Sequence, residues 1–269
     1  MRAVTELAGV RATFKGWPSI AAKGFLWKHF ELPRREIVIR SRGGTSIVAP
    51  LVHNVGALYG ALEVFALRAY DHEWQLEQAP VILDIGANIG AWTLWVSEKR
   101  PGARGTCYEP DPAAAAYLRR NLELNGLQAQ VDVRTEAVSD QTGTASLFQA
   151  HPGEGSSSLQ QTSPVATFDR ETTVPTVSFN EVVGRIESEE ISIVKMDCEG
   201  AEYDILEHSS ADAWARVKRV VLEYHPTAPG RHDHLRQRFA ELGFSEARED
   251  RRPGGLGTLW LARAHTPSE

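Results

Sequence analysis

The sequence predicts an α/β fold built on a doubly wound, mostly parallel sheet, and three observations predict it. Short apolar runs alternate with helical patterns from residue 81 to residue 242. This alternation is typical of parallel strands joined by right-handed helical crossovers. The run at 81–85 passes through Gly86 and Gly90 directly into a helical pattern. Several runs also end in an acidic residue, which places polar groups at the edge of the sheet where ligands bind.

Residues 1–79 precede this alternation, and we interpret them as a cap over the ligand site of the main unit, 80–269. Aromatic residues mixed with lysines predict a helix that packs on the main unit or covers a pocket. Apolar residues at helical spacing predict a second helix just before the main unit. The expected elements of the cap are a helix within 15–30, a strand at 36–40, a turn at 43–44 and a helix from residue 57.

In the main unit, apolar runs predict strands and a 3.6-residue period predicts helices. The expected strands are 81–85, a run ending in 106–112, 129–134, 143–148, 174–177, 191–200, 217–226, and a closing pair at 243–248 and 256–262. The expected helices are 91–98, 113–124, 179–186, 201–207 and 231–242. Asp111 and Ser178 have the residue types that cap a helix start. The segment 151–164 is rich in Gly, Ser and Pro, which predicts a mobile loop that covers the site or merely connects two elements.

Composition narrows the functional classes. The chain has 269 residues, 42% of them apolar, which is enough to build a sizeable core. A net charge of −6 argues against a general nucleic-acid binder. The two cysteines, Cys107 and Cys198, lack metal-ligand spacing and indicate a reducing compartment. No apolar run approaches the ~20 residues needed to span a bilayer, so we expect a cytoplasmic protein with no membrane partner.

The turn after the first strand of the main unit predicts the charge of the ligand. It reads DIGANIG, 84–90, with Asn88 where a dinucleotide fingerprint has the glycine that makes room for a pyrophosphate. Asp84 would repel a diphosphate and would suit an ammonium group. This segment resembles motif I of the class I methyltransferases that use S-adenosylmethionine (SAM), and its Asn88 form resembles that of the FkbM family. The segments EPDP, 109–112, and KMDCEGAEYDIL, 195–206, resemble that family's later motifs.

The resemblance implies a Rossmann-like class I methyltransferase fold, with a seven-stranded, mostly parallel sheet that ends in an antiparallel hairpin. It also implies SAM as methyl donor. Glu109 lies 19 residues after Gly90, close to the spacing of a carboxylate that binds a ribose diol. Backbone and side chain at 136–137 would hold the adenine. The residues expected to bind SAM are Asp84, Gly86, Asn88, Gly90, Thr93, Glu109, Pro110, Glu136, Ala137 and Asp197.

A hydroxyl acceptor needs a base to remove its proton. His225 is our first candidate, because it ends a strand, shares a face with Glu223, and has a side chain that titrates near neutrality. Asp197 is the competing base, and Glu199 lies in the turn beside it. Alternatively, Asp197, Glu223 and His225 would bind Mg²⁺ and orient an acceptor diol. Nothing in their spacing requires a metal.

We therefore expect a SAM-dependent O-methyltransferase that acts on a hydroxyl of a sugar, a polyketide or another secondary metabolite. Three alternatives stay open: methylation of a carboxylate or an amine, a non-catalytic SAM-binding module, and a dehydrogenase with an unusual fingerprint. The strand end at 196–200 lacks the D/N-P-P-Y/F tetrad of nucleic-acid amino-methyltransferases, which argues against a base amine as acceptor. The sequence does not fix the oligomeric state, and it is compatible with a homodimer.

Overall fold

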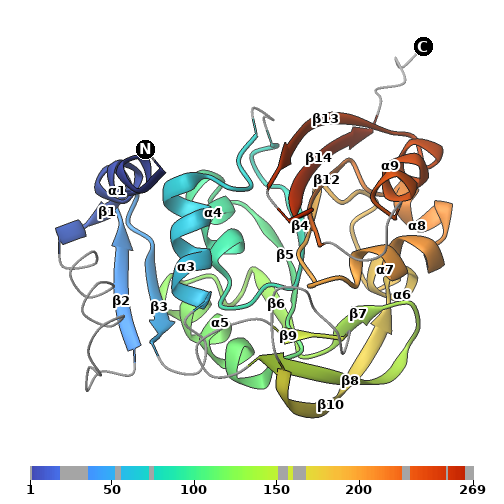
Figure 1. The fold of residues 1–269 in the computed structure, drawn as a ribbon, viewed down its shortest axis with the longest axis horizontal. Helices are drawn as coiled ribbons and strands as arrows, with labels where there is room; N and C mark the ends of the chain where they lie inside the picture. The colour runs from blue at the N-terminus through green and yellow to red at the C-terminus, as the bar shows by residue number, and fades with distance from the viewer. Residues whose placement is uncertain are drawn as a thin grey trace.

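The main sheet has seven strands in the order β13-β14-β12-β11-β4-β5-β6 (Figure 1). The computed structural model describes residues 2–18, 36–51, 56–72, 76–150, 157–159, 168–225, 231–252 and 254–263. The strands of the main sheet are β4 Val81–Ile85, β5 Arg104–Tyr108, β6 Val131–Arg134, β11 Ile193–Met196, β12 Arg219–Tyr224, β13 Phe244–Arg251 and β14 Gly257–Arg263. Strands β6, β5, β4, β11 and β12 are parallel, and β14 and β13 close the sheet as an antiparallel hairpin. The expected fold class is confirmed.

The centre of the sheet is buried on both faces, which is why its strands are continuously apolar. All five residues of β4 and all four of β11 are buried. Neighbouring residues of β4 face opposite sides: Ile82 belongs to one apolar core and Leu83 to the other. The strand order reverses between β4 and β11, so the ligand crevice of a doubly wound sheet is expected at their carboxyl ends.

Helices cover both faces of the sheet. Residues of α3, α4 and α5 contribute to the core that contains Ile82, and residues of α6 to α9 contribute to the core that contains Leu83. The helices are α1 Arg2–Thr13, α3 Gly56–Leu62, α4 Ala91–Lys99, α5 Pro112–Leu124, α6 Phe179–Gly184, α7 Glu202–His208, α8 Ala211–Ala215 and α9 Arg231–Glu241. Asp111 and Ser178 cap α5 and α6 as predicted. No described helix has the length and apolar content to cross a membrane.

A second sheet was not predicted. It has the order β7-β10-β8-β9, with bounds Ala137–Ser139, Phe168–Ser178, Gly143–Ala150 and Ser157–Ser158. The sequence marked only 174–177 of β10, because the preceding residues 170–173 are exposed and polar and are held by main-chain pairing to β8. Most of the loop expected at 151–164 lies outside the described residues.

The cap contains a third sheet, β1-β2-β3, at the opposite end of the molecule from the β13–β14 hairpin (Figure 1). Its strands are β1 Phe14–Lys15, β2 Glu36–Ser41 and β3 Ser46–Pro50. Strand β2 was expected; β3 was missed, because all five of its residues are buried and show no alternation. The helix expected over 15–30 falls largely outside the described residues. Apolar side chains of the cap and of β4 form one continuous core, and the functional boundary near residue 79 stays a prediction.

Asn121 of α5 and Asn125, which directly follows this helix, complete the outer edge of β3. Asn121 is fully buried; it accepts a hydrogen bond from Val48 N (2.8 Å) and donates to Val48 O (3.1 Å) and Ile89 O (3.0 Å). One turn later, Asn125 accepts from Ser46 N (2.9 Å) and donates to Ser46 O (2.7 Å). These side-chain amides satisfy backbone groups of β3 as a further strand would, and they join the cap to the turn that follows β4.

Candidate functional site

The turn after β4 is held against the ends of β5 and β11. The backbone N–H groups of Gly86 and Ala87 both donate to Tyr108 O (3.0 Å each). Gly86 has φ +74°, and a Cβ at this position would lie 1.8 Å from the carbonyl oxygen of Asp197. Only glycine fits such an approach. Asn88 adopts a left-handed conformation as well (φ +50°), which asparagine tolerates better than most residues.

Asp84 anchors this turn from inside the protein. Its side chain is fully buried, and Thr93 Oγ1 donates to Asp84 Oδ2 (2.7 Å). The β4–β11 register places Lys195 opposite Asp84, with Nζ 3.3 Å from Oδ1, and Nζ also donates to Gly86 O (2.7 Å). Burial lowers the pKa of Lys195. The negative charges of Asp84 and Asp197 outweigh this effect, so the pKa of Lys195 lies above its usual range. Lys195 therefore already pairs with the Asp84 carboxylate, which the sequence analysis expected to pair with an ammonium group of the ligand.

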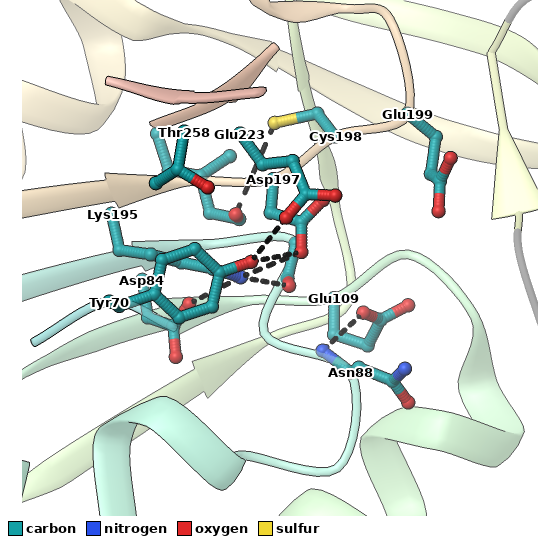
Figure 2. Close-up of polar contacts among 12 residues, drawn as sticks. Tyr70, Asp84, Asn88, Glu109, Lys195, Asp197, Cys198, Glu199, Glu223 and Thr258 are labelled. Carbon is teal, nitrogen blue, oxygen red and sulfur yellow. Dashed lines mark hydrogen bonds and ion pairs between the residues drawn. The ribbon is translucent and has the colours of Figure 1, made fainter. Parts of the chain in front are cut away.

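Glu109 lies next to the same turn. It is buried, and its Oε2 accepts from Asn88 N (2.7 Å) (Figure 2). Its Oε1 accepts from Asp111 N (2.9 Å). Burial, opposed by these two backbone hydrogen bonds, raises the pKa of Glu109 to about 7. Two backbone amides thus fix the carboxyl group, and it lines a cavity, where it can accept hydrogen bonds from a ligand.

Two cavities open at the carboxyl ends of the strands. The first, about 720 Å³ of empty space, is lined by Glu109, Pro110, Ala137, Val138, Leu147 and Leu159 among others. The second, about 910 Å³, is lined by α3, by Glu63 and Tyr70, and by Lys195 and Glu223. Gly86, Asn88, Asp197 and Glu199 line both cavities. The two cavities therefore meet at the turns that follow β4 and β11.

Asp197 lies at this junction and is held by the cap. Tyr70 Oη donates to Asp197 Oδ2 (2.8 Å) and lies 3.2 Å from Glu223 Oε2 (Figure 2). Burial raises the pKa of Tyr70 well above its usual value, and the neighbouring carboxylates raise it further, so the phenol keeps its proton and acts as a donor. Tyr70 follows the π-helix Glu63–Leu67, whose wider turn ends at Arg68 in a left-handed conformation.

Glu223 has further partners on the C-terminal hairpin. Arg252 donates to Glu223 Oε2 (2.8 Å) and to Thr258 Oγ1 (2.9 Å). Burial raises the pKa of Glu223, and Asp197 adds to the rise. Asp197, Glu223 and His225 have ligand atoms within 4.8 Å of one another, the arrangement considered for Mg²⁺. Asp197 and Glu223 already accept hydrogen bonds from Tyr70 and Arg252. His225 is already paired with Glu199 and Glu202, so the chemistry of the three residues does not require a metal.

His225 lies between two glutamates. Its Nδ1 is 3.3 Å from Glu202 Oε1, and its Nε2 is 3.2 Å from Glu199 Oε2. Burial lowers the pKa of His225. The negative charges of Glu202 and then Glu199 outweigh this effect and raise the pKa of His225 to about 10. The imidazole is therefore protonated at neutral pH and cannot accept a proton. It lines neither of the two cavities described above. These observations argue against the role of base that the sequence favoured.

The turn that carries Glu199 is held by the first residue of α7. Glu202 accepts from Cys198 N (2.7 Å) through Oε1 and from Gly200 N (2.9 Å) through Oε2. Glu199 has φ +53°, a conformation in which few non-glycine residues occur. Burial raises the pKa of Glu199 to about 7, although His225 lowers it. Glu199 thus combines a pKa near neutrality with a position at the junction of the cavities.

Glu136 does not lie where the sequence placed it. Its side chain pairs with Arg185 (2.8 Å), and Arg185 pairs in turn with Glu181 (2.7 Å). Ala137 lines the first cavity, whereas Glu136 is not among the residues that line it. The Glu136 side chain is therefore engaged in an ion pair, and its contact with an adenine stays a prediction.

Sequence reasoning missed the roles of Tyr70, Lys195 and Arg252. Lys195 was visible as the first residue of KMDCEG, and its partner follows once β4 and β11 are set in register. Tyr70 and Arg252 reach the site from the two ends of the chain, and no local pattern marks them.

Comparison with known proteins decides the family. The profile described as "Methyltransferase FkbM domain" matches residues 84–246. The chain belongs to the FkbM methyltransferase family. It is a SAM-dependent methyltransferase with the class I fold.

Its relatives include "Methyltransferase 1" of Beauveria bassiana, which is 28% identical over 60% of this chain and 70% of that protein. Another is "31-O-demethyl-FK506 methyltransferase FkbM" of Streptomyces tacrolimicus, which is 27% identical over 61% and 72%. A third, "2-O-methyltransferase NoeI" of Sinorhizobium fredii, is 32% identical over 54% and 63%.

Proposed function

We propose that this FkbM methyltransferase transfers a methyl group to a hydroxyl of a small molecule: a sugar, a polyketide or another secondary metabolite. One observation carries the proposal. Two cavities of different character meet at Asp197 and Glu199, so a donor in the first and an acceptor in the second would meet beside two carboxylates. Two relatives, FkbM and NoeI, are named for O-methylation.

The first cavity fits the adenosine end of SAM. Glu109 offers carboxyl oxygens to a ribose diol, and Ala137, Val138, Leu147 and Leu159 offer an apolar wall to an adenine. Gly86 and Asn88 continue into the second cavity, where the methionine end would lie. SAM, when bound, supplies a methyl group that its sulfonium already activates, so the chain's contribution is to position the acceptor and to remove its proton.

Glu199 is the proposed base. Its carboxylate lines both cavities, and its pKa of about 7 matches the protonation equilibrium that a base needs near neutral pH. Asp197 lies beside it but is engaged by Tyr70. His225 keeps its proton, and its positive charge stabilises the Glu199 carboxylate. No step of this proposal needs Mg²⁺.

The second cavity also favours some acceptors over others. Four carboxyl groups line it, from Glu63, Asp197, Glu199 and Glu223, whereas Lys195 is bound to Asp84. Carboxylates accept hydrogen bonds from hydroxyl groups and repel anions. A neutral polyol acceptor is therefore better supported than a carboxylate. We propose further that the enzyme acts in the cytoplasm without nucleic acid or membrane.

The first experiment measures binding and turnover with the full chain. We expect calorimetry to show heat with S-adenosylhomocysteine and none with NAD; heat with NAD alone would refute the proposal. SAM is then incubated with a panel of neutral saccharides and the matching sugar acids, and methylated products are identified by mass spectrometry. We expect products from neutral hydroxyl acceptors. Binding without any product across the panel would instead favour the non-catalytic module.

Two variants separate the roles within the site. Glu199→Gln should lower kcat about 10²–10⁴-fold, the usual contribution of a base, and leave S-adenosylhomocysteine affinity unchanged. Glu109→Gln should weaken that affinity about 10–100-fold, since a charged acceptor is lost. Glu123→Gln, on the exposed face of α5, is the matched control and should change neither quantity. An unchanged kcat in Glu199→Gln would show that Glu199 is not the base and would favour Asp197 in that role.

A further inference from the structure

Strand β9 reaches the turn that carries Glu199. Ser158 is buried, and its Oγ donates to the carbonyl oxygen of Glu199 (2.8 Å). Main-chain pairing with β8 holds the strand, with Ser158 opposite Phe148. The hydroxyl therefore comes from a different sheet, 41 residues away in sequence, and binds the backbone of the proposed base.

This hydrogen bond completes the support of a turn that needs it. Glu199 is in the left-handed region, which is unfavourable for a residue with a Cβ and persists only where the surroundings hold it. Glu202 accepts from the N–H groups on either side, those of Cys198 and Gly200. Ser158 binds a third polar backbone group of this turn, the Glu199 carbonyl. Together the three hydrogen bonds set the direction in which the Glu199 side chain leaves the backbone.

The residue after Ser158 faces the ligand cavity. Leu159 lines the first cavity together with Ala137, Val138 and Leu147, the wall assigned to the adenine. Glu199 lines the same cavity and also lines the second. Strand β9 thus presents a hydroxyl to the proposed base, and the residue that follows it presents an apolar side chain to the proposed cofactor site.

We propose that Ser158 is a positioning residue that couples cofactor binding to the base: adenosine packing on Leu159 holds β9 in place, and β9 holds Glu199 in the conformation that accepts the acceptor's proton. The inference rests on the proposed function, because it takes the first cavity as the adenosine site and Glu199 as the base. It adds a residue that lines neither cavity and lies outside the motifs at 84–90, 109–112 and 195–206.

The experiment compares Ser158→Ala with the wild-type full chain by amide hydrogen exchange, with and without S-adenosylhomocysteine. The peptide followed is residues 196–203, which contains the Cys198 and Gly200 amides. We expect the ligand to slow exchange of this peptide in the wild type. In Ser158→Ala we expect exchange about fivefold faster, as for the loss of one hydrogen bond, and little slowing by the ligand. The dissociation constant should change less than about twofold, because the Leu159 side chain is kept.

Three further variants keep the result interpretable. Ser158→Thr retains the hydroxyl and should restore slow exchange. Ser97→Ala removes an equally buried serine hydroxyl that donates to a helix carbonyl (2.9 Å), and it should leave this peptide unchanged. Leu159→Ala should weaken S-adenosylhomocysteine binding, which Ser158→Ala does not. With an acceptor in hand, Ser158→Ala should lower kcat, leave the KM for SAM unchanged, and shift the acid limb of the pH–rate profile.

The outcomes separate this inference from the function it rests on. If the ligand slows exchange equally in wild type and Ser158→Ala, the coupling is wrong, whereas methyl transfer by the wild type would still stand. If the wild type binds S-adenosylhomocysteine without any slowing of residues 196–203, the coupling is again wrong. Failure of the wild type to bind the ligand at all would instead overturn the proposed function.

Discussion

Replacing Glu202 by glutamine tests how the protein holds the turn that carries Glu199, the proposed base. The carboxylate is nearly fully buried, accepts from two backbone N–H groups, and lies 3.3 Å from His225 Nδ1. An amide has only one oxygen, so its NH₂ group must face one of the two N–H groups, which then loses its acceptor. Glutamine also removes the negative charge that keeps His225 protonated.

The magnitude follows from these two losses. A buried N–H left without a partner costs about 1–3 kcal/mol. Removing one partner of a buried ion pair costs about 3–5 kcal/mol, part of which His225 recovers by releasing its proton. We therefore expect Glu202→Gln to lower the free energy of unfolding by about 3–5 kcal/mol at pH 7, measured by urea denaturation with the slope held in common. That is a large share of the total stability of a typical domain.

The matched control lies on the same helix. Glu207 forms a shorter contact with His234 (2.8 Å), but both side chains are exposed. Solvent screens such a pair, so Glu207→Gln should change the urea midpoint by no measurable amount. If Glu207→Gln costs as much as Glu202→Gln, or if both cost nothing, then burial is not what gives the Glu202 contacts their strength and the reasoning fails.

The pH dependence gives an independent check. The pKa of His225 is raised from 6.5 to about 10 in the folded protein, with burial opposing the rise and Glu202 the main cause of it. A group with a raised folded pKa stabilises fully below its unfolded pKa and loses that contribution as pH rises through the folded value. The stability gap between wild type and Glu202→Gln should therefore be widest near pH 6.5 and narrow toward pH 10. A gap that widens with pH would contradict the assignment.

Three further substitutions test the scaffold of the site. Lys195→Met leaves the Asp84 carboxylate buried without its cation and should cost about 3–5 kcal/mol in urea denaturation. Asn121→Leu removes three buried hydrogen bonds and should cost about 3 kcal/mol; a loss below about 1 kcal/mol would show that water replaces them. Gly86→Ala places a Cβ 1.8 Å from the Asp197 carbonyl at positive φ, and should abolish S-adenosylhomocysteine binding in calorimetry.

Sequence reasoning located the parallel strands of the main sheet, although the run expected at 191–200 extends past Met196, where β11 ends. The bounds of β4 follow from an apolar run that stops at glycine, and Asp84, Glu109 and Asp197 lie at the strand ends where they were expected. Local chemistry suffices there, because a buried parallel strand must be apolar and a tight turn needs glycine.

The contacts that the site residues make with distant parts of the chain could not be predicted from the sequence. His225 was the first candidate for the base, but Glu202 lies 23 residues earlier and becomes its neighbour only when α7 and β12 pack. Glu136 pairs with Arg185 across 49 residues, and Tyr70 reaches Asp197 across 127. Such contacts depend on tertiary register, which a residue pattern does not encode.

The asparagine contacts between α5 and β3 have a consequence for synthesis of the chain. The backbone of Val48 has its partner Asn121 only after 73 further residues are synthesised, and that of Ser46 has Asn125 only after 79. At about 5–20 residues per second, a ribosome needs roughly 4–15 s to supply them. During that interval a growing chain carries β3 with unmatched amides and carbonyls along one side, a template on which another nascent chain can add a strand. Misassembly of nascent chains should therefore originate at β3.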